Sequence, residues 1–373
     1  MAGHRLRRVL FIDPAGRFWG SEQSLLLLIK SLDRQKYEIA ACLPAHMPLE
    51  AKLQVESVLC YPWFQADLHT RGTVPKIAAL VGLLMAVLVF RPDIIHLNQA
   101  GAVRVTALVA RLLKRPLVIH VRLADDADLV SRRVHSWCST VCIANSAFVA
   151  EQLWIAGIPG KRIHRITNPI EMFDEVSPGL GERKWQVGFV GRLSEDKGIA
   201  LFLRACEIVI RTRPDTKVVV VGGSGGTRAD GQDYLHAMKE LARDLGIAKD
   251  VEFLGFREDV PELMRQMEVF VMASEAEPWG RVVAEAMVGG ASVVAVNSGG
   301  PREMIEHEVS GLLVTQGDSA EMAAAILKLL ENPEAARLMA AAGYDWVRRE
   351  CNLQAHVQKI EKVYDRLIAD AKK

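Results

Sequence analysis

The chain has 373 residues, which is long for one ordinary domain and suits two of about 150–200 residues each. Half of the residues are hydrophobic and 24% are charged, a composition typical of a globular protein with a sizeable core. The formal net charge of +1 excludes a general polyanion binder, so we expect no nucleic-acid partner.

The first half of the chain alternates short apolar runs with helical patterns. Strands are predicted at residues 8–13, 37–43, 93–97, 117–121 and 141–144. Helices are predicted at residues 21–32 and 146–156, with a long apolar helix before the third strand and a basic helix before the fourth. Short apolar strands joined by helices are typical of a parallel sheet that is covered on both faces.

The long apolar helix contains residues 77–90, fourteen residues without a charge. A helix that spans a membrane needs roughly 20 apolar residues, so this segment is too short. We favour a buried helix that covers the sheet. A face lying on a membrane is the alternative that the sequence leaves open.

Charge is distributed unevenly along the chain. Residues 1–177 hold 21 Lys and Arg against 15 Asp and Glu, a balance of +6, and the remainder holds 25 against 30, a balance of −5. A basic first half suggests an anionic partner, either a phospholipid surface or a phosphorylated acceptor. The alternative, to which we give the same weight, is that the surface charge is uneven without any anionic partner.

After Asn168 the periodicity stops, and residues 171–181 are predicted to be a linker. Five further strands are then predicted, at residues 186–190, 217–221, 251–253, 269–272 and 293–296. Helices alternate with them, and the last three are predicted at residues 319–330, 333–349 and 352–371.

These patterns predict an α/β protein with two Rossmann-like, doubly wound domains that face a central cleft. The domains are residues 1–177 and residues 178–354. Residues 355–373 are expected to form a C-terminal helix that packs back on the first domain. In such folds ligands bind at the carboxyl ends of the strands.

The six cysteines form no CxxC pair, and we interpret them as core thiols of a reducing compartment. The apolar run behind the basic N-terminus stops after residue 12, too early for the core of a signal peptide. We therefore expect a cytoplasmic protein, with the inner face of the cytoplasmic membrane as the alternative location.

The most informative segment follows the predicted strand at residues 186–190. Gly191 comes at the strand end, where it could let a ligand approach the backbone, and Arg192 follows it. Lys197 stands where the next helix begins. The two cations could converge on one anion, and the helix dipole would add positive potential. Ordinary solvated charges are the alternative.

A second segment places two carboxylates, Glu277 and Glu285, eight residues apart. Glu285 lies within an apolar helical stretch, where a carboxylate is costly unless it is paired. A ribose diol would be a good partner because it offers two hydrogen-bond donors. The alternative is a salt bridge to Arg281, four residues earlier. A third segment runs through Gly299 and Gly300 into another helix.

Taken together, these segments resemble a known family. The order GRLxxxKG, EPxGxVxxEAM, GGxxE and SGLLV is similar to the C-terminal domain of the retaining glycosyltransferases of family 4, which have the GT-B fold. The resemblance extends to residues 19–22 (WGSE) and 92–96 (PDIIH), so it covers essentially the whole chain.

The resemblance implies that residues 1–177 bind the acceptor and that residues 178–354 bind the nucleotide-sugar. It also implies specific roles for the acidic and basic residues. Arg192 and Lys197 would hold the diphosphate of a nucleotide-sugar donor, acting as catalytic residues with Glu277. Glu277 would address the donor sugar, and Glu285 would bind the ribose hydroxyls.

Further donor-binding candidates follow from the same resemblance. The backbone N–H groups around Trp279 and Gly280, with Arg281 beside them, would address the sugar and its phosphate. Gly20 would reach the same diphosphate from the first domain. The turn of Gly255, Phe256 and Arg257 would lie by the nucleobase.

The resemblance also implies a mechanism. Breaking the anomeric C–O bond leaves a diphosphate, and fixed cations with backbone dipoles can stabilise it without a metal. Retention would proceed on one face of the sugar, so we nominate no protein nucleophile. We therefore expect a metal-independent, hexosyltransferase-type enzyme without a cofactor. Its partners would be a nucleotide-sugar donor and a cell-envelope glycan or lipid-linked acceptor, with peripheral contact to an anionic membrane as a further expectation.

Two positions depart from the family pattern. Many relatives carry a His where Arg122 aligns, and that His contacts the transferring sugar. Here His120 and Arg122 lie on the same face of the predicted strand; we favour Arg122 and keep His120 as either a candidate or a core histidine. The Asn-Gly that relatives have at the domain junction is Asn168-Pro169 here, which would stiffen the hinge.

Two other functions are compatible with the same motifs. A sugar-nucleotide epimerase shares the fold, and a non-catalytic protein could bind a nucleotide-sugar without transferring it. The motifs do not choose between UDP, GDP and ADP, nor do they identify the sugar or the acceptor.

Overall fold

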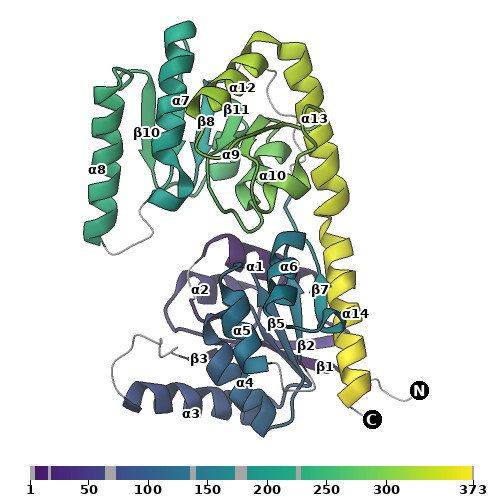
Figure 1. The fold of residues 1–373 in the computed structure, drawn as a ribbon. Helices are drawn as coiled ribbons and strands as arrows, with labels where there is room; N and C mark the ends of the chain where they lie inside the picture. Colours follow the sequence, from purple (N-terminus) through teal and green to yellow (C-terminus); the bar gives the residue numbers. More distant parts are fainter. Residues whose placement is uncertain are drawn as a thin grey trace. The chain divides into compact units, whose positions relative to one another are not determined.

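The structure is a computed structural model that describes residues 5–15, 18–63, 73–134, 140–172, 183–223 and 228–371. The chain forms two compact units (Figure 1). Unit 1 comprises Met1–Pro169 and Cys351–Lys373, and unit 2 comprises Ile170–Glu350. The boundary predicted between residues 177 and 178 lies outside the described residues.

Unit 1 contains a parallel sheet of seven strands in the order β3-β2-β1-β4-β5-β6-β7. The strands are β1 (Arg7–Ile12), β2 (Tyr37–Leu43), β3 (Leu59–Pro62), β4 (Ile94–Leu97), β5 (Leu117–Val121), β6 (Thr140–Ala144) and β7 (Ile163–Arg165). The order reverses between β1 and β4, so the carboxyl ends of these two strands flank the switch point where doubly wound folds bind ligands.

The helices of unit 1 form a layer on each face of the sheet. They are α1 (Gly20–Ser31), α2 (Pro48–Val55), α3 (Thr73–Phe90), α4 (Val103–Leu112) after the short η1 (Ala100–Ala102), α5 (Asp126–Val134), α6 (Ala147–Ile155) and α14 (Leu353–Ala371), with η2 (Gly160–Arg162) before β7. Alternation along β1 sorts the two cores, because Leu10 and Ile12 pack with α3 to α6 while Val9 and Phe11 pack with α1, α2 and α14.

Unit 2 repeats this order with a parallel sheet of six strands, β10-β9-β8-β11-β12-β13. The strands are β8 (Trp185–Val190), β9 (Val218–Val221), β10 (Val251–Gly255), β11 (Met267–Met272), β12 (Ser292–Val296) and β13 (Leu312–Val314). The two strand orders confirm the prediction of two doubly wound, Rossmann-like units.

The helices of unit 2 alternate with its strands. They are η3 (Glu195–Lys197), α7 (Ile199–Thr212), α8 (Arg228–Asp244), α9 (Val260–Met264), α10 (Arg281–Val288), α11 (Pro301–Met304), α12 (Ser319–Glu331) and α13 (Pro333–Glu350). The main core of this unit lies between the sheet and the helices α7, α8 and α12. Helix α10 packs against β12 and α13.

Three strands were not predicted, and all three lie at sheet edges. They are β3, β7 and β13. An edge strand has one neighbour only, and β3 and β7 have no fully buried residue, so neither shows the continuous apolar run of a central strand. The five described cysteines carry no disulfide; Cys138 lies outside the described residues.

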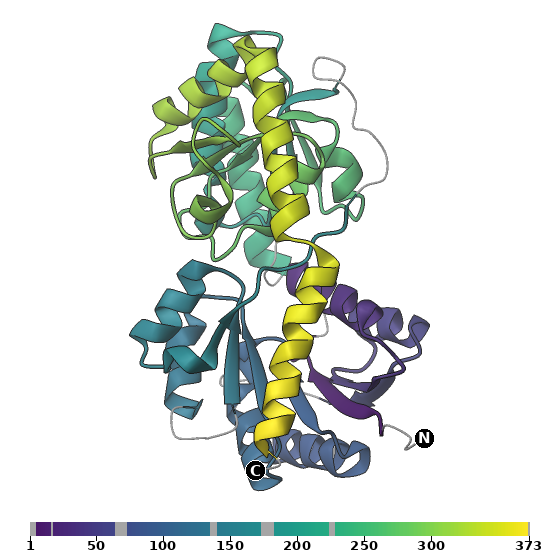
Figure 2. The ribbon, with the colours of Figure 1, turned by 90° about the vertical axis from the view of Figure 1, so that its right-hand side faces the viewer.

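Helix α14 packs on one side of the unit 1 sheet (Figure 2). Buried histidines lie on that side. Tyr364 Oη on α14 lies 2.6 Å from Nδ1 of His96 on β4. Nδ1 of His356 lies 2.8 Å from the carbonyl oxygen of Thr167. Burial lowers the pKa of His96 to about 3 and that of His356 to about 4, and the positive charge of Arg122 adds to both shifts. Both imidazoles are therefore neutral in the folded protein at neutral pH.

These histidines should make folding of unit 1 pH-dependent. The unfolded chain binds a proton at each histidine below about pH 6.5, whereas the folded chain does not until the pH is well below that. The free energy of unfolding should therefore be greatest above about pH 6.5. It should fall, by about 1 kcal/mol per pH unit for each histidine, as the pH decreases toward 4. Urea unfolding at about pH 7 and about pH 5 measures the difference.

The substitution His356→Gln should reduce the difference in the free energy of unfolding between about pH 7 and about pH 5. His236→Gln is the matched control, because His236 is an exposed histidine of α8 and should leave the difference unchanged. An identical pH dependence in wild type and His356→Gln would contradict this account of the buried histidines.

Candidate functional site

The loop that follows β8 brings the predicted cations together. Arg192 Nη2 lies 3.2 Å from Asp196 Oδ2, and Lys197 Nζ lies 3.8 Å from the same oxygen. Lys197 Nζ also lies 2.8 Å from Oε2 of Glu277, which belongs to the loop after β11. Arg192, Lys197 and Glu277 thus form one charged cluster at the carboxyl edge of the sheet. The loops concerned leave β8 and β11, the two strands that flank the switch point of unit 2.

Asp196 is a member of this cluster that the sequence analysis missed. Burial alone would raise the pKa of its carboxyl, but a hydrogen bond from Ser194 and the charges of Arg192 and Lys197 hold that pKa below its usual value. The spacing of four residues between Arg192 and Asp196 is the signal that could have identified the pair.

Glycines let the loop after β12 lie directly on the loop after β11. The backbone N–H of Gly300 donates a 2.8 Å hydrogen bond to the carbonyl of Glu277. A Cβ at Gly299 would lie 2.1 Å from that carbonyl oxygen, and one at Gly300 would lie 2.3 Å from the Cα of Trp279. Real Cβ atoms do not approach backbone this closely, so glycine is required at both positions. Trp279 is buried, so its indole ring is part of the packing rather than of an exposed surface.

Gly280 and Arg281 begin helix α10 at the same edge. Gly280 has a φ of +92° and stands at the N-cap, a conformation that favours glycine. Arg281 Nε lies 2.7 Å from Glu285 Oε1, one turn along the helix. The salt bridge that the sequence analysis kept as the alternative for Glu285 is therefore present. Among the described residues, none donates a hydrogen bond to the second oxygen of Glu285.

Gly191 is in close backbone contact with the loop after β9. A Cβ at Gly222 would lie 1.8 Å from the carbonyl oxygen of Gly191, whereas a Cβ at Gly191 itself would make only ordinary contacts. The close contact between the two loops thus requires glycine at position 222. It also means that the carbonyl of Gly191 packs against protein rather than facing solvent. Gly198 is equally constrained, because its Cβ would lie 2.2 Å from the carbonyl oxygen of Ala273.

The predicted nucleobase turn lies at the end of β10. Gly255 has a φ of +69°, and its carbonyl accepts a hydrogen bond from Gly222 N–H. Phe256 is 67% exposed, and its Cβ would contact a side chain at Gly223. Arg257 forms an exposed ion pair with Asp259. The turn therefore presents an aromatic ring at the same edge as the charged cluster.

In unit 1 a buried polar network holds Arg122 at the end of β5. Its guanidinium donates to the backbone and side-chain oxygens of Asn98, at 3.0 and 2.6 Å, and to Oδ1 of Asn168 at 2.8 Å. Asn98 in turn donates to the buried carboxylate of Asp13, at 2.7 Å. His120 lies inside the core, where burial and the charge of Arg122 keep its pKa well below the usual value. Only Arg122 of this pair reaches the sheet edge.

Gly20 is the first residue of α1 and is held by a capping arrangement. The N–H of Trp19 donates to Oε2 of Glu22 at 2.9 Å, while Ser21 and Gln99 donate to the other carboxylate oxygen. Glu22 is buried, and burial together with the nearby negative charge of Asp13 raises its pKa. Gln99 follows β4, so this arrangement places Gly20 near the switch point of unit 1.

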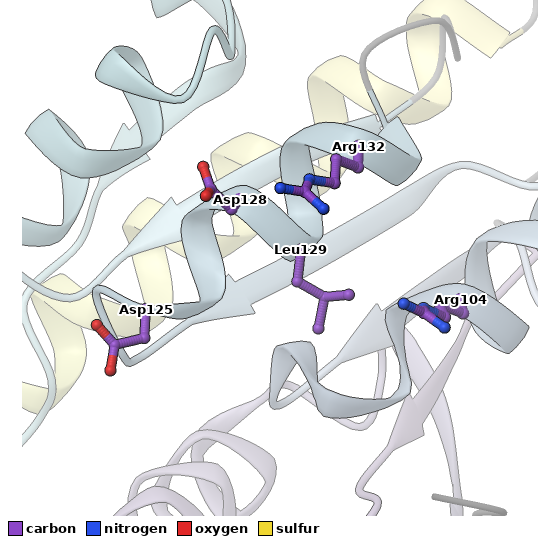
Figure 3. A pocket seen from close by; sticks show the side chains of 5 residues that line it. All are labelled: Arg104, Asp125, Asp128, Leu129 and Arg132. Atoms are coloured by element: carbon purple, nitrogen blue, oxygen red, sulfur yellow. The ribbon is translucent and has the colours of Figure 1, made fainter. Parts of the chain in front are cut away.

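A charged hollow of about 270 Å³ lies between α4 and α5 of unit 1 (Figure 3). Arg104, Asp125, Asp128, Leu129 and Arg132 line it. Arg104 lies near the start of α4, and Asp125 immediately precedes α5, so the hollow opens toward the carboxyl end of the sheet. Among the described residues, no ion pair joins these four charged side chains to one another or to any other group.

The described residues contain neither a candidate metal site nor a candidate membrane span. No group of three or more His, Cys, Asp or Glu side chains in this part of the chain could hold a metal ion. No helix in it is long and apolar enough to cross a membrane.

Comparisons with known proteins match both units. Residues 172–346 match the family described as glycosyl transferases group 1, and residues 19–172 match glycosyltransferase family 4. The chain is 32% identical over 222 residues to a D-inositol 3-phosphate glycosyltransferase of Corynebacterium jeikeium, which covers 56% of this chain and 51% of that protein. A protein of the same description from Corynebacterium urealyticum is 35% identical over 239 residues, or 60% of this chain and 55% of its own. The chain thus spans about half the length of the curated relatives it matches.

Solved structures resemble the fold over nearly its full length. Anabaena Alr3699/HepE in complex with UDP and glucose has a TM-score of 0.83 at 25% identity, with 96% of this chain and 99% of that chain covered. Sucrose-phosphate synthase from Thermosynechococcus elongatus has a TM-score of 0.73 at 18% identity, with 98% and 100% covered. The fold is therefore that of the GT-B glycosyltransferases.

Proposed function

Because this chain belongs to the family 4 glycosyltransferases, we propose that it transfers a hexose from a nucleotide-sugar to an acceptor with retention of anomeric configuration. The observation that carries the proposal is the cluster of Arg192, Lys197 and Glu277 at the switch point of unit 2. Two cations beside a helix start suit a diphosphate, and a carboxylate within 2.8 Å of one of them suits the hydroxyls of the attached sugar.

UDP is the first donor nucleotide to test, because Alr3699/HepE was solved in complex with UDP and glucose. In the proposed pose the base lies against the exposed ring of Phe256, beside Gly255 and Arg257. The ribose hydroxyls donate to the second oxygen of Glu285, and Arg281 orients that carboxylate through its 2.7 Å bond to Oε1. The salt bridge and the ribose contact are then compatible rather than exclusive.

In the proposed reaction the bond between the anomeric carbon and the diphosphate oxygen breaks, and a bond from the acceptor oxygen forms on the same face. The acceptor proton passes to an oxygen of the departing diphosphate. Arg192 and Lys197 stabilise the negative charge that develops on the diphosphate. As this charge develops, contacts with the diphosphate replace the ion pairs that both cations make with Asp196. In many enzymes, hydrogen-bond donors held in place toward the charge that develops in the transition state make the largest single contribution to the rate enhancement.

Removing either cation should slow the reaction strongly. We expect Arg192→Ala and Lys197→Ala each to lower kcat/KM by about 10²- to 10³-fold, the loss typical of one preorganised electrostatic donor. Product formation from UDP-glucose measures it. Arg211→Ala is the matched control, because Arg211 forms an exposed ion pair with Glu207 near the far end of α7. Near-normal kinetics in both cluster variants would exclude the diphosphate role.

We further propose that the reaction needs no metal ion, since the two cations supply the positive charge that the leaving diphosphate requires. Activity should then persist in the presence of EDTA. Assays with EDTA, and with Mg²⁺ or Mn²⁺ added back, check this. Complete loss of activity in EDTA that either metal restores would contradict the proposal.

We place the acceptor at unit 1, in the hollow between α4 and α5. Arg104 and Arg132 can hold a phosphate there, while Asp125 and Asp128 can accept hydrogen bonds from hydroxyls. A phosphorylated polyol carries both groups, and the relatives' description as D-inositol 3-phosphate glycosyltransferases supports such an acceptor. The same group could be presented by a cell-envelope glycan or a lipid-linked acceptor. Arg122, rather than the buried His120, would face the transferring sugar.

Weakening the phosphate contact should affect acceptor binding more than turnover. With D-inositol 3-phosphate as the trial acceptor, Arg132→Ala should raise KM for the acceptor about tenfold and leave kcat within a few-fold. Lys161→Ala is the control, because Lys161 is an exposed cation that precedes β7, at the amino end of the sheet. An unchanged acceptor KM in Arg132→Ala would remove the hollow from the acceptor site.

A further inference from the structure

Helix α3 exposes a continuous apolar stripe. Five large hydrophobic side chains on it are between 47% and 60% exposed: Ile77, Val81, Met85, Leu88 and Val89. Their spacing of three or four residues puts them on one face of the helix. The sequence favoured a buried helix here, and the structure shows that this is only half correct, because the opposite face alone is buried.

That opposite face packs into the core of unit 1 through Leu83, Ala86, Val87 and Phe90. The helix is therefore apolar on all sides from residue 77 to 90, although one side lies at the surface. A surface helix of a soluble domain normally carries polar residues on its outer side. A contiguous apolar surface marks a site of contact with another molecule or with a membrane.

The charged residues of the helix beside the stripe are all positive. Helix α4 packs beside α3 (Figure 1), and its outer side carries Leu108, Arg111 and Leu112, with Lys114 just beyond its end. The sequence has no Asp or Glu between Asp93 and Asp125, nor within α3. The α3–α4 face therefore combines exposed aliphatic side chains with exposed basic ones, and neither helix carries a carboxylate.

We propose that the α3–α4 face docks on an anionic phospholipid bilayer. The aliphatic side chains enter the boundary between headgroups and acyl chains, while the basic side chains pair with the headgroup charge. Neither the apolar insertion nor the charge pairing suffices alone, since reversible anchoring at a membrane generally requires two such contributions. The chain lies on the surface without crossing it, because no helix among the described residues is long and apolar enough to span.

A second copy of the chain explains the face less well. A two-fold dimer through this surface would bring α4 and its basic residues toward the same helix of the partner, and like charges disfavour that arrangement. An anionic bilayer offers hydrocarbon and negative charge together. The docking does not depend on the donor site, but it rests on the proposed function in one respect, because it would give the enzyme access to a lipid-linked acceptor.

Sedimentation with vesicles tests the docking. The full chain should bind vesicles of phosphatidylglycerol mixed with phosphatidylcholine, and should bind phosphatidylcholine vesicles far more weakly. Binding should decrease as salt rises, because surface charge pairing is screened. Met85→Ser combined with Val89→Ser should lower the affinity about tenfold or more, since two apolar anchors are lost. Lys114→Glu should lower it as well, and its effect should disappear at high salt.

The control is Val309→Ser combined with Leu338→Ser, which removes two equally exposed hydrophobic side chains from unit 2 and should leave vesicle binding unchanged. Thermal unfolding should be similar in all variants, because every altered side chain is at the surface.

Three outcomes would overturn the proposal. They are absence of binding to the anionic vesicles at low salt, binding that Met85→Ser with Val89→Ser leaves unchanged, and a dimer that this double variant dissociates while the protein ignores vesicles. A thermal shift with UDP separates this test from the proposed function, because UDP is proposed to bind unit 2. Loss of the UDP shift would count against the donor site and leave the docking result standing.

Discussion

Every strand pairing in the described residues is parallel, so each sheet has all of its strand carboxyl ends at one edge. The functional groups depend on this constraint. In unit 2 the loops that leave β10, β9, β8, β11 and β12 follow one another along that edge, and they carry every donor-binding candidate of that unit. Lys197 and Glu277, eighty residues apart in the sequence, become neighbours because their loops leave adjacent parallel strands.

The second requirement is that these loops approach each other without side chains between them. Gly222 lies against the carbonyl of Gly191, and Gly299 and Gly300 lie against the backbone of the loop after β11. A methyl group at Gly222, Gly299 or Gly300 would collide with main-chain atoms, which cannot yield as a flexible side chain does. The charged cluster can then form across loops that are already fixed, so the Lys197–Glu277 pair is preorganised by backbone packing.

In unit 1, buried polar groups hold the functional side chain at the sheet edge, whereas in unit 2 close contacts at glycines hold the loops there. Asp13, Asn98 and Asn168 hold the guanidinium of Arg122 at its edge, and the network is buried enough that breaking one member would leave others unsatisfied. This organised edge and the apolar, basic α3–α4 face belong to the same unit. Acceptor recognition and membrane contact, as proposed, would therefore both be tasks of unit 1.

The sequence by itself determined the fold class and the central strands, and it identified the segments that are proposed to bind the donor, because apolar runs and glycine-rich strand ends are local patterns. It did not find the edge strands β3, β7 and β13, of which the first two are too exposed to show an apolar run. Only the tertiary structure decided between alternatives that share a local pattern. It placed His120 in the core, gave Glu285 its bond to Arg281, and left one face of α3 uncovered. Each outcome depends on which distant segment packs there, and periodicity along the chain carries no such information.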